Sequence, residues 1–439
     1  MLQQKNKKLE AKKSEVRLYA RDKEPGQPKT LYEKLLYKAL NRASRGRLDI
    51  ITPNGSHFVF GDRESTQKAT LHVHDYAFFK KCVLFGTTGF GEAYVENLWD
   101  SEDLYAVLDW FMQNTDSTPG FAESTARFVW VNILGISNYL WHLTRKNTPK
   151  KAKENIAFHY DLSNDFYRLM LDSTMTYSSA LYLTGKETLQ EAQINKYETI
   201  CRKLNLQEQN HVLEIGSGWG GFAVYAAEKY GCKVTTITIS KEQFAYTSNL
   251  IKQKNLESKI QIELKDYRKV QGQYDKIVSI EMIEAIGLEY YDDFCKILSR
   301  SLKPDGIAVI QCITYPDSRF KPYTRRTDWI QKHIFPGSLL ISLHEFRKSL
   351  LRVGKLEVYD VESMGISYAR TLREWRHNFK ANLDEVKAMG FSEAFIRKWL
   401  FYLVFCEVGF ASRYINDVQI VLSRPENRKL EDFHGIAHA

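Results

Sequence analysis

Short apolar runs alternate with segments of helical period along the second half of the chain. Each apolar run is bounded by turn residues and predicts a buried strand, and each longer segment between them predicts an amphipathic helix. The predicted strands are 211–215, 233–239, 259–264, 276–280, 306–313, 356–361 and 419–422, and the predicted helices are 221–230, 241–254, 290–302 and 343–352. This alternation predicts an α/β fold with a doubly wound sheet that has helices on both faces.

The first half of the chain has a different pattern, in which shorter alternating runs are separated by turn signals such as Pro53-Asn54-Gly55. Such runs predict half-buried strands. The predicted elements are a helix over 31–45, strands over 48–51, 57–60 and 69–73, and helices around 78–85 and 104–113. They predict a small α+β domain over residues 30–116, ahead of a larger domain over residues 156–425.

The remaining segments differ from both domains in composition. Residues 1–29 are rich in lysine and predict a disordered tail, and residues 426–439 predict a short tail at the other end. The connector 117–155 has an aromatic apolar stretch followed by basic residues over 145–153. That composition suits a helix in a membrane interface, and it equally suits a linker helix packed between the two domains.

Composition and charge narrow the function classes. The chain has 439 residues with a formal net charge of +9, and its six cysteines include no C-x-x-C pair. Scattered cysteines predict buried thiols in a reducing compartment and no zinc site. Without an apolar leader or a stretch long enough to span a bilayer, the sequence predicts a cytoplasmic protein that is able to touch a membrane surface.

The most informative motif is the glycine loop after the first strand of the larger domain. Glu214 ends the strand, and Gly216, Ser217, Gly218 and Gly220 follow. The spacing is not the G-x-G-x-x-G of a dinucleotide site, and the loop has no P-loop lysine. One interpretation is an ordinary strand–turn–helix with glycines for packing. The pattern E-x-G-x-G-x-G also resembles the first motif of S-adenosylmethionine-dependent methyltransferases, which have a Rossmann-like sheet.

A bound S-adenosylmethionine needs a groove for its amino-acid tail, contacts for its ribose and a clamp for its adenine. Glu214 and the glycine loop suit the tail, and residues at the next two strand ends suit the rest. Asp266 is placed to accept from the adenine amino group, although an aspartate in a turn is common for local reasons. The predicted cofactor-binding residues are Tyr177, Ser178, Glu214, Gly216, Ser217, Gly218, Thr238, Ile239, Gln243, Asp266 and Tyr267.

Motifs on both sides of the glycine loop make a more specific resemblance. They are Phe158 to Tyr167, Met175 to Leu181, Leu189 to Gln193, Ile280 to Gly287, Ile334 to Gly337 and Tyr368 to Trp375. In this order they resemble the cyclopropane fatty acid synthase family, which includes the mycolic acid cyclopropane synthases. The resemblance covers roughly residues 155–425. Residues 30–115 resemble the N-terminal domain of the longer, phospholipid-acting members, which implies a lipid-handling domain.

The resemblance implies methylene transfer from S-adenosylmethionine to the cis double bond of an acyl chain, with bicarbonate as proton acceptor. Glu284 falls on the family's bicarbonate-site glutamate, Ile313 on its backbone contributor and Tyr368 on its tyrosine. Tyr177 and Ser178 fall beside the sulfonium. Glu284 at a helix N-terminus and Tyr368 as a core tyrosine are the structural alternatives.

Two positions depart from the family pattern. Ser179 replaces the usual cysteine, and Gln311 replaces a histidine. Serine still offers a backbone N–H, whereas glutamine is able to donate a hydrogen bond but cannot carry a proton away. Between the two neighbouring acids, the motif register favours Glu284 over Glu281 as the key carboxylate. Relatives with this motif also give methyl- or methylene-branched chains, so the ring product and the branched products both stay open.

The expected partner is an unsaturated phospholipid in the membrane surface, reached by a peripherally associated protein, with no nucleic acid. Surface binding through one amphipathic segment is weak, so a homodimer would help by avidity. Two rival functions remain. One is an N-methyltransferase for small amines, and the other is a lipid-binding protein with a vestigial methyltransferase fold. The intact glycine loop and the predicted site residues argue against the second.

Overall fold

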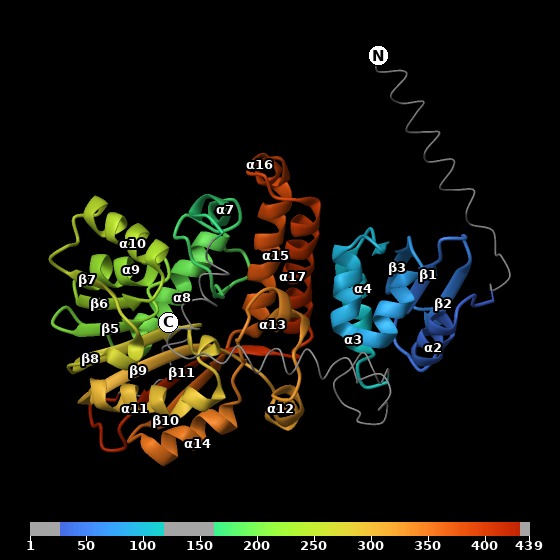
Figure 1. Ribbon diagram of the computed structural model, residues 1–439. Helices are drawn as coiled ribbons and strands as arrows, with labels where there is room; N and C mark the ends of the chain where they lie inside the picture. Colours follow the sequence, from blue (N-terminus) through green and yellow to red (C-terminus); the bar gives the residue numbers. More distant parts are fainter. Residues whose placement is uncertain (1–26, 118–161, 431–439) are drawn as a thin grey trace.

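Residues 27–117 and 162–430 are the part of the chain that the computed structural model describes, and they form two lobes joined side by side (Figure 1). The predicted N-terminal tail up to residue 26 and the connector over 118–155 lie outside the described residues. The motif residues up to 161 and the end of the chain after residue 430 also lie outside them.

The larger lobe contains the predicted sheet. Its strands are β5 (His211–Ile215), β6 (Lys233–Thr238), β7 (Ile260–Leu264), β8 (Tyr274–Ile280), β9 (Leu302–Thr314), β10 (Glu357–Ser363) and β11 (Asn416–Ser423), in the order β10-β11-β9-β8-β5-β6-β7. Strands β9, β8, β5, β6 and β7 are parallel to one another, and β11 runs antiparallel to both β9 and β10. The α/β prediction is confirmed, and this sheet is mixed at one edge.

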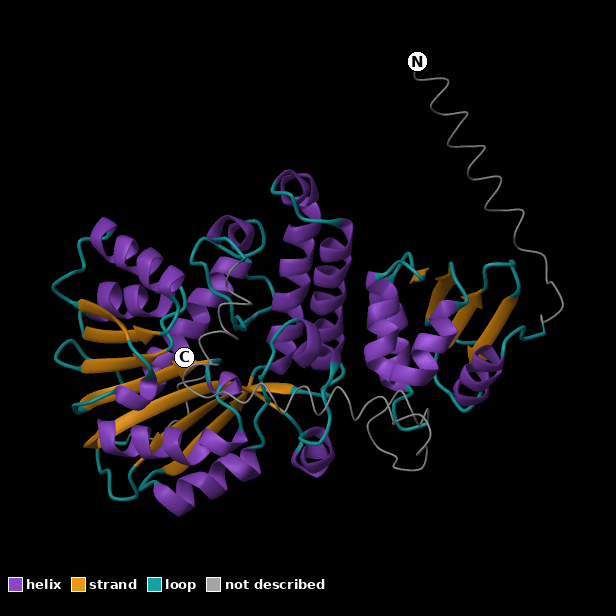
Figure 2. Ribbon diagram, viewed as in Figure 1, coloured by secondary structure: helices purple, strands orange, loops and turns teal. Residues whose placement is uncertain are grey.

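Helices cover both faces of this sheet, as Figure 2 shows. The helices are α8 (Leu189–Lys203), α9 (Gly221–Tyr230), α10 (Lys241–Gln253), α11 (Tyr291–Ser301) and α14 (Leu343–Val353). Two consecutive residues of β5 pack on opposite faces: Leu213 packs with α11 and α14, whereas Val212 packs with α8 and α9. A strand buried on both faces is typical of a parallel sheet.

A third group of helices lies between this sheet and the smaller lobe (Figure 1). It comprises α12 (Asp317–Tyr323), α13 (Trp329–His333), α15 (Gly365–Ala381), α16 (Leu383–Ala388) and α17 (Glu393–Ala411), while the short α7 (Asn164–Arg168) packs beside them. Helix α17 is apolar all round, which is expected of a helix buried between two lobes. Among the described residues, no helix combines the length and apolarity needed to cross a bilayer.

The smaller lobe is an α+β unit, as predicted. It consists of α2 (Leu31–Leu40), β1 (Arg47–Ile51), β2 (His57–Gly61), β3 (Lys68–Val73), α3 (Ala77–Val95), β4 (Trp99–Asp100) and α4 (Leu104–Gln113), with strand order β2-β1-β3-β4. The prediction of a helix over 31–45 was too long, because α2 ends at the Asn41 cap.

Helix α3 is longer than the predicted 78–85 because it continues to Val95 through three glycines. Gly86 adopts φ 56°, so the helix bends there. A Cβ at Gly91 would lie 2.6 Å from the Trp329 ring of α13, so glycine is required for this close approach. Packing between the lobes therefore overrides the low helix propensity of this glycine-rich segment.

A buried arginine joins the two lobes. Arg397 of α17 donates to the carbonyls of Tyr94 (2.6 Å) and Trp99 (2.9 Å) and pairs with Asp100 (3.1 Å). Nearby, Glu92 of α3 accepts from Lys332 at 2.6 Å. These contacts anchor the smaller lobe on α17 and α13.

We expect Arg397→Met to lower the free energy of unfolding by about 3 kcal/mol, because it leaves two buried carbonyls and a carboxylate without their donor. Chemical denaturation followed by circular dichroism measures this change. Lys398→Met on the same helix is the matched control and should change stability by less than about 1 kcal/mol. Equal effects of the two variants would show that Arg397 does not anchor the lobe.

Candidate active site

A single cavity of about 430 Å³ opens at the carboxyl ends of β5, β6 and β8 and reaches the helices between the lobes. Open α/β sheets bind ligands at this edge. The predicted residues that line it are Tyr177, Ser178, Glu214, Gly216, Ser217, Gly218, Thr238, Ile239, Gln243, Asp266, Tyr267, Glu284, Ile313 and Tyr368. The structure therefore brings together most of the predicted cofactor and catalytic residues, which come from segments far apart in the sequence.

The glycine loop turns sharply between β5 and α9. Gly216, Gly218 and Gly220 have φ values of 100°, 49° and 88°, a region that favours glycine. A Cβ at Gly220 would lie 2.7 Å from Thr247, whereas a Cβ at Gly218 would project into open space. The loop thus forms a cradle whose backbone is accessible to a ligand.

Glu214 supplies a buried carboxylate beside this cradle. Its residue exposure is 2%, and its Oε2 atom has no hydrogen-bond partner among the described residues. Burial raises the pKa of Glu214 to about 8. An unpaired buried carboxylate is costly, and a ligand ammonium placed here would relieve that cost. The amino-acid tail of S-adenosylmethionine carries such an ammonium, so Glu214 and the loop fit this cofactor.

The ends of the next two strands supply polar side chains to the cavity wall. The Thr238 hydroxyl donates to the side-chain amide oxygen of Gln243 at 2.8 Å, so these two side chains form one polar unit at the cavity wall. The carboxylate of Asp266 is held by Arg268, with contacts of 2.9 and 2.6 Å. Asp266 lines the cavity, and its contact with an adenine amino group stays a prediction. Tyr267 lines the cavity from the same turn.

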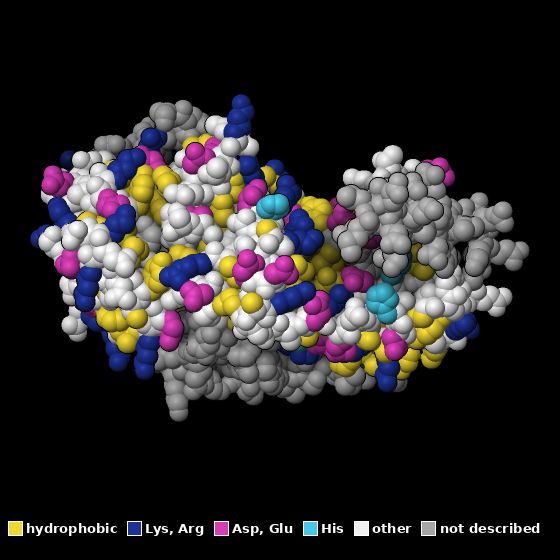
Figure 3. Space-filling model, turned by 90° about the horizontal axis from the view of Figure 1, so that it is seen from above, with side chains coloured by type: hydrophobic (Ala, Val, Ile, Leu, Met, Phe, Trp, Pro, Cys, Tyr) yellow, Lys and Arg dark blue, Asp and Glu magenta, His cyan; other side chains and the backbone are white. Residues whose placement is uncertain are grey.

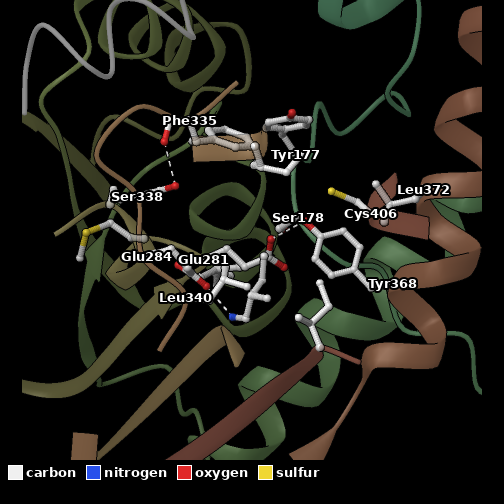
Figure 4. Close-up of a pocket in the computed structure, with 18 of the residues that line it drawn as sticks. Tyr177, Ser178, Glu281, Glu284, Phe335, Ser338, Leu340, Tyr368, Leu372 and Cys406 are labelled. Atoms are coloured by element: carbon white, nitrogen blue, oxygen red, sulfur yellow. Dashed lines mark hydrogen bonds between the residues drawn. The ribbon is translucent and has the colours of Figure 1, made fainter. Parts of the chain in front are cut away.

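The most connected acid of the site is Glu281, directly after β8. Its Oε1 atom accepts from the Ser179 backbone N–H (2.7 Å) and from Gln311 Nε2 (2.9 Å), and its Oε2 atom accepts from the Tyr368 hydroxyl (2.7 Å). Figure 4 shows the Tyr368 ring reaching across the cavity from α15 toward Glu281. Burial raises the pKa of the Glu281 carboxyl, whereas these hydrogen bonds and the buried Lys196 favour its ionised form.

This arrangement changes the expected roles of Ser179 and Gln311. Both are fully buried and stand behind Glu281, so neither lines the cavity. Their donors, together with Tyr368, are occupied by a carboxylate of the chain itself. The predicted bicarbonate ion does not fit these donors, because Glu281 already uses them.

The motif register predicted Glu284, and not Glu281, as the key carboxylate. The sequence signal for Glu281 is the combination of an acid at position 281 with an amide at position 311. The Glu281 N–H donates to the Gln311 carbonyl at 2.9 Å, so the ends of β8 and β9 place both side chains together. Because the neighbouring strand supplies a carboxylate of its own, position 311 does not need a histidine that carries protons.

Glu284 lies beside Glu281 in the same wall (Figure 4). Its Oε1 atom accepts from the Ile313 backbone N–H, and its Oε2 atom has no partner among the described residues. Burial and the neighbouring Glu281 raise the pKa of Glu284 to about 8. Glu284 and Ile313, which were both predicted to contact a bicarbonate ion, contact each other directly, and Glu284 forms a second acid that faces the cavity.

A buried network behind the cavity holds these acids. Gln311 Nε2 also donates to Asp417 Oδ2 (2.9 Å), and Gln419 Nε2 donates to Gln311 Oε1 (3.3 Å). This arrangement fixes the Gln311 amide so that its NH₂ group faces the carboxyl groups of Glu281 and Asp417. On the other side, Lys196 donates to Ser178 Oγ at 2.7 Å, and burial lowers its pKa to about 8.

Aromatic faces complete the site. Tyr177 stacks on Trp375 with ring centroids 5.1 Å apart, and its hydroxyl lies 2.7 Å from that of Tyr402. Tyr368 stacks on Phe410 at 4.3 Å. Such π faces stabilise a nearby cation without bonding to it.

The raised pKa values predict a pH-dependent stability of the cofactor-free protein. Because Glu214 and Glu284 keep their protons up to about pH 8 when folded, and lose them near their ordinary pKa when unfolded, the folded state binds more protons in this window. Stability should therefore fall as the pH rises from about 5 to 8. Thermal unfolding across this range should show a weaker slope for Glu284→Gln, and an unchanged slope would contradict the assignment.

The fold and the glycine-loop site define a class of enzyme, the S-adenosylmethionine-dependent methyltransferases. A solved mycolic acid cyclopropane synthase, CmaA1, complexed with SAH and CTAB, matches with a TM-score of 0.57 and 32% identity. The match covers 62% of this chain and 98% of that one. Coclaurine N-methyltransferase matches with a TM-score of 0.59 at 19% identity, which shows the fold alone.

Family membership follows from the sequence. The family model described as mycolic acid cyclopropane synthetase matches residues 147–420, and the chain belongs to this family. The tuberculostearic acid methyltransferase UfaA1 of Mycobacterium tuberculosis is 35% identical over 83% of this chain and 87% of its own length. The cyclopropane-fatty-acyl-phospholipid synthase of Escherichia coli is 33% identical over 81% and 88%.

Proposed function

We propose that this enzyme transfers a methylene group from S-adenosylmethionine to the cis double bond of an unsaturated acyl chain of membrane phospholipid, giving a cyclopropane chain. One observation carries the proposal: a single cavity joins the glycine loop, the buried Glu281 and a long apolar wall. A small polar substrate would leave that wall unused, whereas an acyl chain would cover it.

S-adenosylmethionine would supply an electrophilic methyl group on a sulfonium. Glu214 and the glycine loop would hold its amino-acid tail, and Tyr177 and Ser178 would lie beside the sulfonium. The alkene π electrons form the new bond to the methyl carbon as the carbon–sulfur bond breaks. The resulting carbocation on the acyl chain lies among aromatic and apolar side chains, which exclude water that would otherwise trap it as an alcohol.

Glu281 then acts as the proton acceptor in place of bicarbonate. Its carboxylate takes a proton from the added methyl carbon, and the released electron pair closes the three-membered ring. Ser179, Gln311 and Tyr368 act as positioning residues because each donates a hydrogen bond to this carboxylate. General-base catalysis of this kind contributes about 10²–10⁴-fold in rate.

A lipid substrate also implies where the protein acts and what it binds. We propose a cytoplasmic protein that associates peripherally with the membrane, with the lobe over residues 30–116 handling lipid. The apolar cavity wall supports a lipid partner, and a homodimer remains our proposal for avidity at the surface.

A branched product is the second candidate. The relative at 35% identity is named a tuberculostearic acid methyltransferase, and the match covers 87% of its length. A 1,2-hydride shift in the same carbocation, followed by loss of a proton from the added methyl carbon, gives a methylene branch, whereas loss of a proton from a chain carbon gives a methyl-branched alkene. The branched products and the ring therefore share the methyl transfer and differ in how the carbocation loses its proton.

Product analysis tests the proposed function. Purified enzyme is incubated with S-adenosylmethionine and vesicles of dioleoyl phosphatidylglycerol, and the extracted lipid is analysed by mass spectrometry and proton NMR. We expect one added carbon per modified chain and the upfield ring-proton signals of a cyclopropane. Unaltered olefinic lipid together with methylation of added amines would contradict the proposal.

A further inference from the structure

The catalytic cavity does not end within the larger lobe. Part of its wall comes from α3 and α4 of the smaller lobe. The lining residues from this lobe are Thr87 and Phe90 of α3, Leu108, Phe111 and Met112 of α4, and Thr115 just after α4. Because one cavity contains both these residues and Glu281, a flexible ligand that reacts near Glu281 is able to extend between the lobes.

The surface that the smaller lobe presents to the cavity is hydrocarbon in character. Phe90 packs against Phe111 with centroids 4.9 Å apart and against Phe401 of α17 at 6.4 Å. Phe401 in turn stacks on Phe405 at 5.9 Å. The hydroxyl of Thr115, just after α4, donates to the Phe111 backbone carbonyl, so it needs no polar partner from a ligand.

This wall is held in place by the contacts between the lobes. The Arg397 bonds to Tyr94 and Trp99 fix α17 against the end of α3. The absence of a Cβ at Gly91 lets α3 approach Trp329 and Phe401 closely. Figure 3 shows hydrophobic side chains gathered along the junction between the two lobes. A wall fixed in this way is able to discriminate ligand shape, because it cannot readily move aside.

The solved relative gives a reason to assign specificity to this wall. The match to CmaA1 accounts for 98% of that chain but only 62% of this one. The family model starts at residue 147, after the smaller lobe. Residues 147–420 make up about the same share of this chain as that match, so the match is accounted for without α3 and α4.

We propose that α3 and α4 form an acyl-chain subsite, which binds a hydrocarbon segment of the substrate and selects chains by length and shape. The inference rests on the proposed function, since it assigns a place to the chain whose double bond reacts near Glu281. The side-chain volumes of Phe111 and Met112, both half-buried at the cavity wall, set the room available.

Competition between substrates tests the subsite. The enzyme receives mixed vesicles of phosphatidylglycerols whose monounsaturated acyl chains differ in length on either side of the double bond, and mass spectrometry gives the relative turnover of each. Phe111→Ala enlarges the subsite and should shift relative turnover toward longer chains by about tenfold, the discrimination expected for one or two methylenes. Met112→Trp narrows it and should shift turnover toward shorter chains by a similar factor.

Leu104→Ala is the matched control, because Leu104 lies on α4 and is half-buried but does not line the cavity. This variant should keep the wild-type profile. If both lining variants also keep it while remaining active, the subsite is wrong although the proposed function stands. If wild-type enzyme modifies none of the lipids, the proposed function itself fails.

Photo-crosslinking covers the case in which a lining variant does not fold. Wild-type enzyme is irradiated with phosphatidylglycerols that carry a diazirine at successive acyl positions, and labelled peptides are identified by mass spectrometry. We expect at least one position to label peptides from α3 or α4. Labels confined to the larger lobe for every position would overturn the subsite.

Discussion

Glu281→Gln should lower turnover by about 10³-fold while changing the dissociation constant of S-adenosylmethionine by less than about threefold. The amide keeps the shape of the side chain but cannot accept the proton, and general bases contribute about 10²–10⁴-fold. Initial rates by lipid mass spectrometry and cofactor affinity by calorimetry measure the two quantities. Glu284→Gln should reduce turnover less, because Glu284 takes no proton in the proposed reaction.

A rescue experiment separates the base from a merely structural acid. Glu281 has φ 47°, a conformation that suits glycine, so Glu281→Gly relieves backbone strain at this position and leaves the donors of Ser179, Gln311 and Tyr368 free for water or an added anion. Added bicarbonate should then restore at least tenfold of the lost turnover, and it should not stimulate wild-type enzyme. Bicarbonate dependence of the wild type would show that the ion, and not Glu281, accepts the proton.

The second large effect concerns the cofactor. Glu214→Gln should weaken binding of both S-adenosylmethionine and S-adenosylhomocysteine by about 10- to 100-fold, because a charge-assisted hydrogen bond to the ligand ammonium contributes about 1.5–3 kcal/mol. Isothermal titration calorimetry measures this change. Glu242→Gln on α10 serves as the control, since this acid is exposed and does not line the cavity. Equal affinities of Glu214→Gln and wild type would place the amino-acid tail elsewhere.

The sequence predicted the larger sheet well because its signals are local. The seven strands were placed within a few residues of their observed bounds, and α9 was placed at Gly221–Tyr230. The glycine loop and Glu214 were also recognised from one continuous segment. In the smaller lobe, α3 was predicted too short because its glycines disfavour a helix, and the Trp329 contact that favours close packing is remote in sequence.

The proposed proton acceptor was harder to predict because its partners are far apart in the chain. Tyr368 and Ser179 lie 87 and 102 positions from Glu281, and Asp417 lies 106 positions from Gln311. Residue types at aligned motif positions indicated which groups meet, but they did not show that a side chain would occupy the place expected for an ion. Only the observed contacts reveal that Ser179 and Gln311 face Glu281 and not the cavity.

The origin of the removed proton tests the central claim most directly. The wild-type enzyme is given S-adenosylmethionine with a trideuterated methyl group and an unsaturated phospholipid, and the product is analysed by mass spectrometry and NMR. Proton removal by Glu281 from the transferred carbon predicts that the new carbon keeps two of its three deuterium atoms. Retention of all three, or transfer of no carbon to the acyl chain, would contradict this account.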